Sequence, residues 1–108
     1  MRGALSLSAA VTTLVLGASA MAAPAPDAAR QAYLTDLLLQ DCGSCHGMTM
    51  KGGLGPPLLP QSLQDRNDDV LIEAILDGRP GTPMPPWRSE LSPEDAAWLV
   101  ALLRSGPP

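Results

Sequence analysis

The feature that most constrains this chain is one short segment, Cys42-Gly43-Ser44-Cys45-His46. The chain has two cysteines and one histidine in all, so every thiol and the sole imidazole fall inside this segment. Two cysteines separated by two residues and followed directly by histidine are the attachment pattern of c-type haem. Each thiol can add to one vinyl group of the porphyrin, and the adjacent imidazole is then held beneath the ring, where one nitrogen can bind iron.

Three other interpretations of these cysteines compete with haem attachment. A disulfide between Cys42 and Cys45 would close a very short loop, stabilise little and leave His46 without a role. A thioredoxin-like redox pair belongs in a βαβ unit, and no strand-like alternation surrounds the segment. A structural zinc site needs four protein ligands, whereas the segment offers three. Covalent haem attachment therefore accounts best for all three side chains.

The N-terminal residues have the pattern of a secretory signal peptide. Arg2 supplies a positive start, residues 4–17 are uncharged and mostly apolar, and residues 18–22 hold two overlapping A-x-A cleavage sites. The alternative is an uncleaved membrane anchor, because the uncharged stretch is long. We expect cleavage, which makes residues 1–22 the signal peptide and residues 23–108 one periplasmic domain that does not enter the membrane.

Size and charge narrow the possible functions. The formal net charge of −4 argues against a nucleic-acid-binding protein, because such proteins are normally basic. A mature domain of fewer than about 90 residues buries a small core and usually needs additional stabilisation. A covalently bound porphyrin can provide it, and the absence of phenylalanine agrees with a core built partly from cofactor. We expect this domain to be a monomer.

Three amphipathic segments predict an all-α fold. Helices are expected over Ala28–Asp41, over Asp68–Asp77 and from about Ser92 to Leu103. In each, apolar side chains recur at i, i+1, i+4 and i+5, which places them on one helical face. The faces consist of Tyr33, Leu34, Leu37 and Leu38 in the first helix, Val70, Leu71, Ala74 and Ile75 in the second, and Trp98, Leu99, Leu102 and Leu103 in the third.

Capping residues mark the ends of the later two helices. Asn67 can cap the second helix, and Gly78 and Pro80 end it. The sequence Ser-Pro-Glu-Asp at residues 92–95 offers an N-cap, a proline at the first helical position and an acid at the third. The segments between the helices are rich in glycine and proline and are expected to be loops.

The order of these elements is similar to that of class I cytochromes c. Gly55-Pro56-Pro57-Leu58 resembles the Gly-Pro-x-Leu segment of that family, and residues 78–87, the methionine loop, resemble its axial-methionine segment. More narrowly, the chain resembles the NirC-type small monohaem cytochromes of denitrifying bacteria, whose genes accompany the haem-d-containing nitrite reductase. The resemblance implies three main helices around one haem c that is linked covalently to Cys42 and Cys45.

The second iron ligand is expected to be methionine. His46 would bind iron on one face of the haem, and a thioether on the other face gives the usual low-spin site of cytochromes c. Met84 is far along the chain, and the prolines around it stiffen its loop, so less entropy is lost in holding its sulfur on iron. Met48 and Met50 follow the histidine closely and are expected to fill gaps in the core.

Several other residues are expected to support the haem or the core. In the family, the ligand histidine donates a hydrogen bond to the carbonyl of the proline in Gly-Pro-x-Leu, which implies Pro56 here. Trp87 is expected to contact the haem, either by a hydrogen bond to a propionate or by packing on its edge. Tyr33 and Trp98 are expected in the core where the first and last helices meet.

Three cations lie in the segments around the cofactor, Lys51, Arg79 and Arg88. One interpretation is that the arginines offset the charge of the haem propionates, with Arg79 the named haem contact. The other is that all three form a basic collar around the exposed haem edge, which would meet an acidic patch on a redox partner.

With both axial positions filled, the iron has no vacancy for a substrate, so the expected function is one-electron transfer rather than catalysis. The resemblance implies periplasmic nitrite reductase, or a protein that supplies it, as the redox partner. Two alternatives stay open. One is an accessory redox role in maturing the haem d cofactor of nitrite reductase, with a maturation factor as partner. The other is an open-site haem enzyme or ligand-binding protein.

Overall fold

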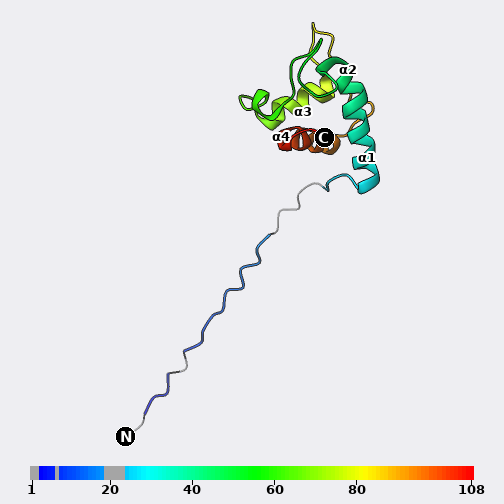
Figure 1. The fold of residues 1–108 in the computed structure, drawn as a ribbon. Coiled ribbons are helices and arrows are strands. Elements are labelled where there is room, and N and C mark those ends of the chain that lie inside the picture. The colour runs from blue at the N-terminus through cyan, green and yellow to red at the C-terminus, as the bar shows by residue number, and fades with distance from the viewer. Residues whose placement is uncertain (1–2, 7, 19–23) are drawn as a thin grey trace.

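The computed structural model describes residues 3–6, 8–18 and 24–108. Residues 3–6 and 8–18 form neither helix nor strand and follow an extended trace (Figure 1). The apolar side chains of this segment, such as Leu14, are almost fully exposed. Within the described ranges, no helix is both long and apolar enough to cross a membrane. The expected cleavage sites fall almost entirely on residues 19–23, which lie outside the described residues.

The described residues contain helices and no strand, which confirms the predicted all-α class. The elements in chain order are α1 (Ala28–Leu37), the π-helical turn η1 (Leu38–Cys42), α2 (Gly43–His46), the 3₁₀ turn η2 (Pro60–Ser62), α3 (Asp68–Asp77) and α4 (Pro93–Ser105). In Figure 1, α4 lies against α3 and beside α1.

The first helix differs from its predicted span of Ala28–Asp41. Regular α-helix ends at Leu37, but a π turn and then α2 carry the helical backbone on to His46. The amide of Gly43 donates to the Leu38 carbonyl, a five-residue step that accommodates one extra residue in the turn. Gly47, at φ 92°, then ends the helix. The haem motif is therefore the last part of a continuous helical segment.

The later helices begin where capping chemistry predicted. The Asn67 side chain accepts a hydrogen bond from the Val70 amide at 3.0 Å, and α3 spans its predicted range. At α4, the Ser92 hydroxyl accepts from the Asp95 amide at 3.1 Å and the Asp95 carboxylate accepts from the Ser92 amide at 3.0 Å. This reciprocal capping box fixes the start of α4, which extends two residues beyond Leu103.

The core lies where α1, α3 and α4 converge. Its buried side chains come from α1, η1, α3 and α4 and from the loops between them, which ties the loops to the helical frame. They are Leu34, Leu37, Leu38, Met50, Leu63, Leu76, Leu91, Ala96, Leu99 and Leu103.

Some side chains that were predicted to be buried are not. Tyr33 is 48% exposed at the edge of the α1 face, where the Arg30 guanidinium lies 4.8 Å from its ring centroid. Val70 is exposed in the first turn of α3, and Leu76 is the buried residue of that helix.

Met48 is 57% exposed, whereas Met50 is fully buried as predicted. Trp98 is half-buried and packs against the core as predicted.

One ion pair joins α1 to the start of α4. Arg30 donates from Nη2 to Oδ2 of Asp95 at 2.8 Å and from Nε to Oδ1 at 3.3 Å. The same Nη2 also donates to the Glu90 carbonyl at 2.9 Å. Asp95 is 6% exposed, so its carboxylate needs these donors to compensate for burial.

A second arginine ties α4 to the loop that precedes α3. Arg104 donates to the carboxylate of Asp68 at 2.6 Å and to the carbonyls of Leu63 and Arg66 at 3.2 and 2.6 Å. One guanidinium therefore holds the start of α3 against the end of α4, which helps to place the helix that carries the methionine loop.

Candidate haem site

The helical segment places the three side chains of the haem motif on one face. Cys42, Cys45 and His46 follow each other at i, i+3 and i+4, positions that are neighbours on a helix surface. Each is half-buried, and both thiols are free rather than joined in a disulfide. The described residues include no cluster of three or more His, Cys, Asp or Glu side chains that could hold a metal ion, so nothing there supports a structural zinc site.

The electrostatics of Cys42 disfavour a redox-active thiol pair. Burial, reinforced by the neighbouring Asp41 and Cys45, raises the pKa of the Cys42 thiol to about 11. Reactive cysteines of thioredoxin-like proteins have a lowered pKa, because the thiolate is the nucleophile. The raised pKa of Cys42 is the opposite of the lowered pKa that an attacking cysteine needs.

The imidazole of His46 is oriented by a backbone carbonyl. Its Nδ1 lies 2.7 Å from the carbonyl oxygen of Pro56, the contact that the family resemblance implied. A carbonyl can only accept, so Nδ1 carries the proton and donates it. This leaves Nε2 as the nitrogen available to a metal, and the hydrogen bond makes that nitrogen a more basic ligand.

Gly55 allows the backbone to lie against the imidazole ring. A Cβ at this position would stand 2.8 Å from both Cε1 and Nδ1 of His46, closer than any side chain can approach. The Gly55 amide also donates to the Cys45 carbonyl at 2.8 Å, and the Gly52 amide donates to the His46 carbonyl at 2.8 Å. Residues 47–58, here called the histidine loop, therefore fold back and satisfy the last carbonyls of α2. Sequence reasoning used Gly55 only as part of a motif and missed this steric role.

Met50 anchors the histidine loop in the core. It is fully buried and has a positive φ of 58°, an uncommon backbone conformation for a residue with a side chain. Its amide donates to the Gly47 carbonyl and its carbonyl accepts from the Leu58 amide, both at 2.9 Å. The buried thioether holds this backbone in place, which keeps the Pro56 carbonyl at the imidazole.

The methionine loop is built on the end of α3. The Arg79 amide donates to the Met84 carbonyl at 3.2 Å, and the Thr82 hydroxyl donates to the Arg79 carbonyl at 2.6 Å. Farther along, the Trp87 amide donates to the carbonyls of Ile75 and Leu76 at 3.1 Å. The loop thus caps the helix that precedes it, and Met84 is held half-buried between two attached ends.

The aromatic ring of Trp87 packs against the core residues and is half-buried. Its predicted contact with the haem or a propionate stays a prediction. Arg79, the named candidate for a propionate contact, is exposed at the start of the methionine loop, and its role also stays a prediction.

Arg88 forms an ion pair with a side chain of the same chain, which weakens its contribution to the predicted basic collar. It donates from Nε and Nη2 to the two carboxylate oxygens of Asp77, each at 2.7 Å. The guanidinium holds the pKa of Asp77 below its usual range. Because this pair neutralises itself, Lys51 and Arg79 are the cations of the predicted collar that remain.

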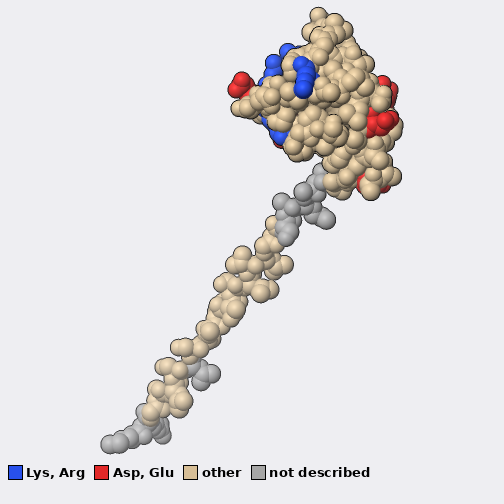
Figure 2. Space-filling model, in the orientation of Figure 1, with Lys and Arg blue, Asp and Glu red and all other residues tan. Residues whose placement is uncertain are grey.

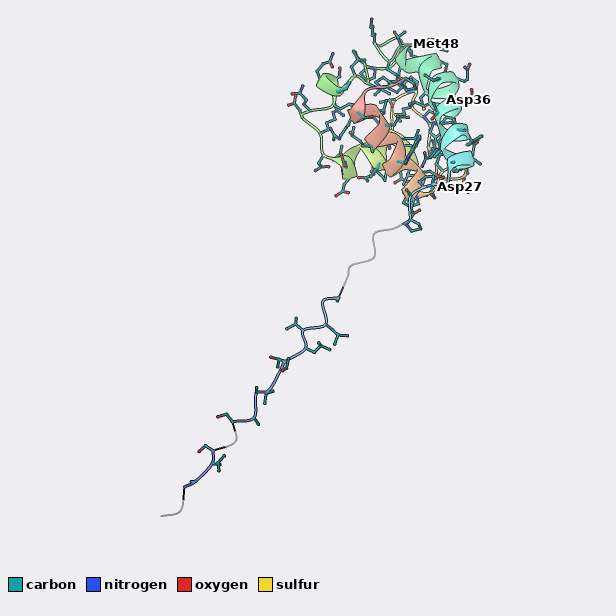
Figure 3. All side chains as sticks on the ribbon, turned by 60° about the horizontal axis from the view of Figure 1, so that its bottom comes forward. Asp27, Asp36 and Met48 are labelled. Atoms are coloured by element: carbon teal, nitrogen blue, oxygen red, sulfur yellow. The ribbon has the colours of Figure 1, made fainter. Side chains whose placement is uncertain are left out.

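The surface charge is unevenly distributed. Figure 2 shows acidic side chains along the flank formed by α1 and basic side chains on another part of the visible face, with a further acidic group at the edge beside them. In Figure 3, Asp27 and Asp36 lie along α1, while Met48 lies beyond its far end, next to α2. The acidic flank is therefore separate from the loops that carry the ligand candidates.

The residues present fit a covalently attached haem c. Two free thiols and one imidazole share a helical face, and one imidazole nitrogen is reserved by a carbonyl while the other is left for a metal. Imidazole and thioether are the donor pair of cytochromes c, and the chain offers a thioether in a loop attached at both ends.

Comparison with known proteins agrees with this chemistry. Residues 29–103 match the family model described as cytochrome c oxidase, cbb3-type, subunit III. The chain is 57% identical over 81 residues to cytochrome c55X of Pseudomonas aeruginosa, covering 75% of this chain and 68% of that protein. Its fold is similar to that of a solved c-type cytochrome, NirC, with a TM-score of 0.73 at 56% identity, over 74% of this chain and 94% of that one.

A larger protein also contains a similar segment. The chain is 42% identical over 95 residues to the dihydro-haem d1 dehydrogenase of Pseudomonas aeruginosa, covering 88% of this chain but 18% of that protein. The similarity is thus confined to a small part of the dehydrogenase.

Proposed function

We propose that this chain, which belongs to the cytochrome c family, is a periplasmic one-electron carrier whose single haem c is ligated by His46 and Met84. We propose the dissimilatory nitrite reductase system as the process that it serves, and the similarity to cytochrome c55X and to NirC supports this proposal. We also infer that residues 1–22 are a cleaved signal peptide, which accounts for export to the compartment where this process takes place.

The observation that carries the proposal is the hydrogen bond between His46 Nδ1 and the Pro56 carbonyl. An imidazole that is fixed in this tautomer presents Nε2 in one orientation, as a ligand of unchanging geometry requires. When bound, the haem supplies a reversible one-electron couple of its iron. The protein contributes two thioether links through Cys42 and Cys45, one oriented nitrogen, and a thioether in a restrained loop.

Rigid axial ligation favours electron transfer over catalysis. The histidine loop is pinned by Met50, and the methionine loop is attached to α3 before and after Met84. Ligands that stay in place in both oxidation states keep the structural change on electron transfer small. They also leave no open iron position, which argues against the alternative of a haem enzyme or a ligand-binding protein.

Replacing the proposed thioether ligand tests the ligation directly. Optical spectra of Met84→Ala holoprotein, oxidised and reduced, are expected to lose the low-spin methionine-ligated form that the wild type shows. Met48→Ala is the matched control, because that methionine is exposed and its loss should leave the spectrum unchanged. An unchanged Met84→Ala spectrum, or rapid carbon monoxide binding by the native ferrous protein, would contradict the proposal.

A second candidate function is a redox role in maturing the haem d cofactor. The similarity to a segment of dihydro-haem d1 dehydrogenase is the observation that favours it. Deleting the gene separates the two functions. Nitrite reductase that is purified complete but is poorly reduced in the deletion strain supports electron donation, whereas nitrite reductase that lacks intact haem d supports maturation.

A further inference from the structure

Gly78 follows α3 directly and lies against the backbone of the methionine loop. It is buried, with a positive φ of 67°. A Cβ on Gly78 would stand 2.7 Å from the carbonyl oxygen of Met84 and 2.8 Å from both the carbonyl carbon of Pro85 and the nitrogen of Pro86. All three atoms belong to the backbone, so no side chain rotation can relieve such a contact.

The methionine loop has little freedom to move away from Gly78, because it is attached on both sides. The Arg79 amide holds the Met84 carbonyl at 3.2 Å on one side, and the Trp87 amide holds α3 carbonyls at 3.1 Å on the other. The prolines around Met84 fix several φ angles between these two attachments. A displacement forced at Gly78 therefore moves the Met84 backbone itself.

We propose that Gly78 is a positioning residue that sets how closely the Met84 sulfur can approach the iron. The inference rests on the proposed ligation by Met84. Gly78 does not touch the haem iron; it acts because its missing side chain lets the methionine loop lie directly on the end of α3.

A second glycine in the same loop provides a matched control. Gly81 also has a positive φ, of 78°, but a Cβ there would meet nothing within 4 Å. Alanine at either position has to adopt an unfavourable backbone conformation. Alanine at position 78 also collides with the Met84 backbone, a contact that alanine at position 81 does not make.

The test compares wild type, Gly78→Ala and Gly81→Ala as purified ferric holoproteins. Imidazole competes with a thioether for the iron, and the far-red charge-transfer band reports sulfur bound to ferric iron. We expect the imidazole affinity of Gly78→Ala to rise about tenfold and its sulfur band to weaken. A tenfold change in affinity requires only a small loss in the free energy with which the Met84 sulfur binds the iron. The imidazole affinity of Gly81→Ala should stay within about twofold of the wild-type value, even if its melting temperature falls as much as that of Gly78→Ala.

Equal imidazole affinities for the two glycine variants would overturn the inference. If Gly78→Ala accumulates poorly, the imidazole affinity is measured on the holoprotein that is recovered, and an affinity equal to that of Gly81→Ala still overturns the inference. Absence of the sulfur band in the wild type would refute the ligation itself, which is a separate outcome.

Discussion

The ion pair between Arg30 and Asp95 allows a quantitative prediction about stability. Asp95 is almost completely buried at the start of α4 and accepts hydrogen bonds from Arg30 and from the Ser92 amide. In Asp95→Asn the single amide oxygen can keep the bonds at Oδ2, while its NH₂ group faces the Nε donor of Arg30. The variant therefore loses the charge and one acceptor without creating a cavity.

The expected cost follows from these contacts. Losing a hydrogen bond between charged groups lowers the free energy of unfolding by about 1.5–3 kcal/mol. Because the Arg30 side chain is 37% exposed, solvent screening reduces this, and we expect about 1–2 kcal/mol. For a domain of this size, each kcal/mol lowers Tm by about 4–8 °C. Denaturant unfolding of the holoprotein, followed by circular dichroism, measures the difference.

The pH dependence provides an independent check. The Arg30 guanidinium, with the Ser92 amide, holds the pKa of Asp95 below its usual range. A lowered carboxyl pKa stabilises the fold fully above the unfolded value of about 3.9, and this stabilisation is lost as the pH falls through the lower folded value. The wild type should therefore keep a constant advantage over Asp95→Asn from about pH 7 to pH 5, and this advantage should shrink below about pH 4.

A double-mutant cycle shows which partner is responsible. Arg30→Met keeps an aliphatic side chain and removes the guanidinium, including its contact with the Tyr33 ring. If the ion pair is the cause, Arg30→Met/Asp95→Asn should be less destabilised than the sum of the two single variants. Additive effects, or an Asp95→Asn variant that is within about 0.5 kcal/mol of the wild type, would refute the reasoning.

Three further predictions concern the loops and their anchors. Arg104→Met removes one hydrogen bond to the start of α3 and two to the loop before it, and should lower the free energy of unfolding by about 1–3 kcal/mol, measured by urea unfolding. Gly55→Ala places a Cβ against the His46 ring and should yield holoprotein with a perturbed Soret band and a raised fraction of high-spin iron; an unchanged spectrum would show that the contact is unimportant. Met50→Ala should cost about 2–5 kcal/mol, whereas exposed Met48→Ala should stay within about 0.5 kcal/mol, and equal losses would contradict the assigned burial.

Local signals predicted the parts of the fold that local interactions determine. Asn67 and the capping box at residues 92–95 mark helix starts because their hydrogen bonds join residues only three apart. The end of the first helix was predicted wrongly, because nothing in the local pattern announces a π turn at Leu38–Cys42. The helical backbone therefore continues through the haem motif, which was expected to follow the helix.

Burial was predicted less well because it depends on what packs against each face. Periodicity placed Tyr33 on the apolar face of α1, yet the tertiary structure leaves it at the edge under Arg30. Met48 and Met50 were both expected to fill gaps in the core, although only Met50 turns into it. Met48 and Met50 are only two residues apart, and the course of the loop backbone determines that the first thioether is exposed and the second is buried.

The sequence by itself determined the chemistry of this protein. Two thiols and a histidine at that spacing can hold a haem whatever surrounds them, because the bonds they form are local. The tertiary structure decided how those groups are held. It brings the Pro56 carbonyl to the imidazole, leaves no space for a side chain at Gly55 or Gly78, and pairs Arg88 with Asp77. These contacts join separate segments of the chain, so they exist only once the helices have packed.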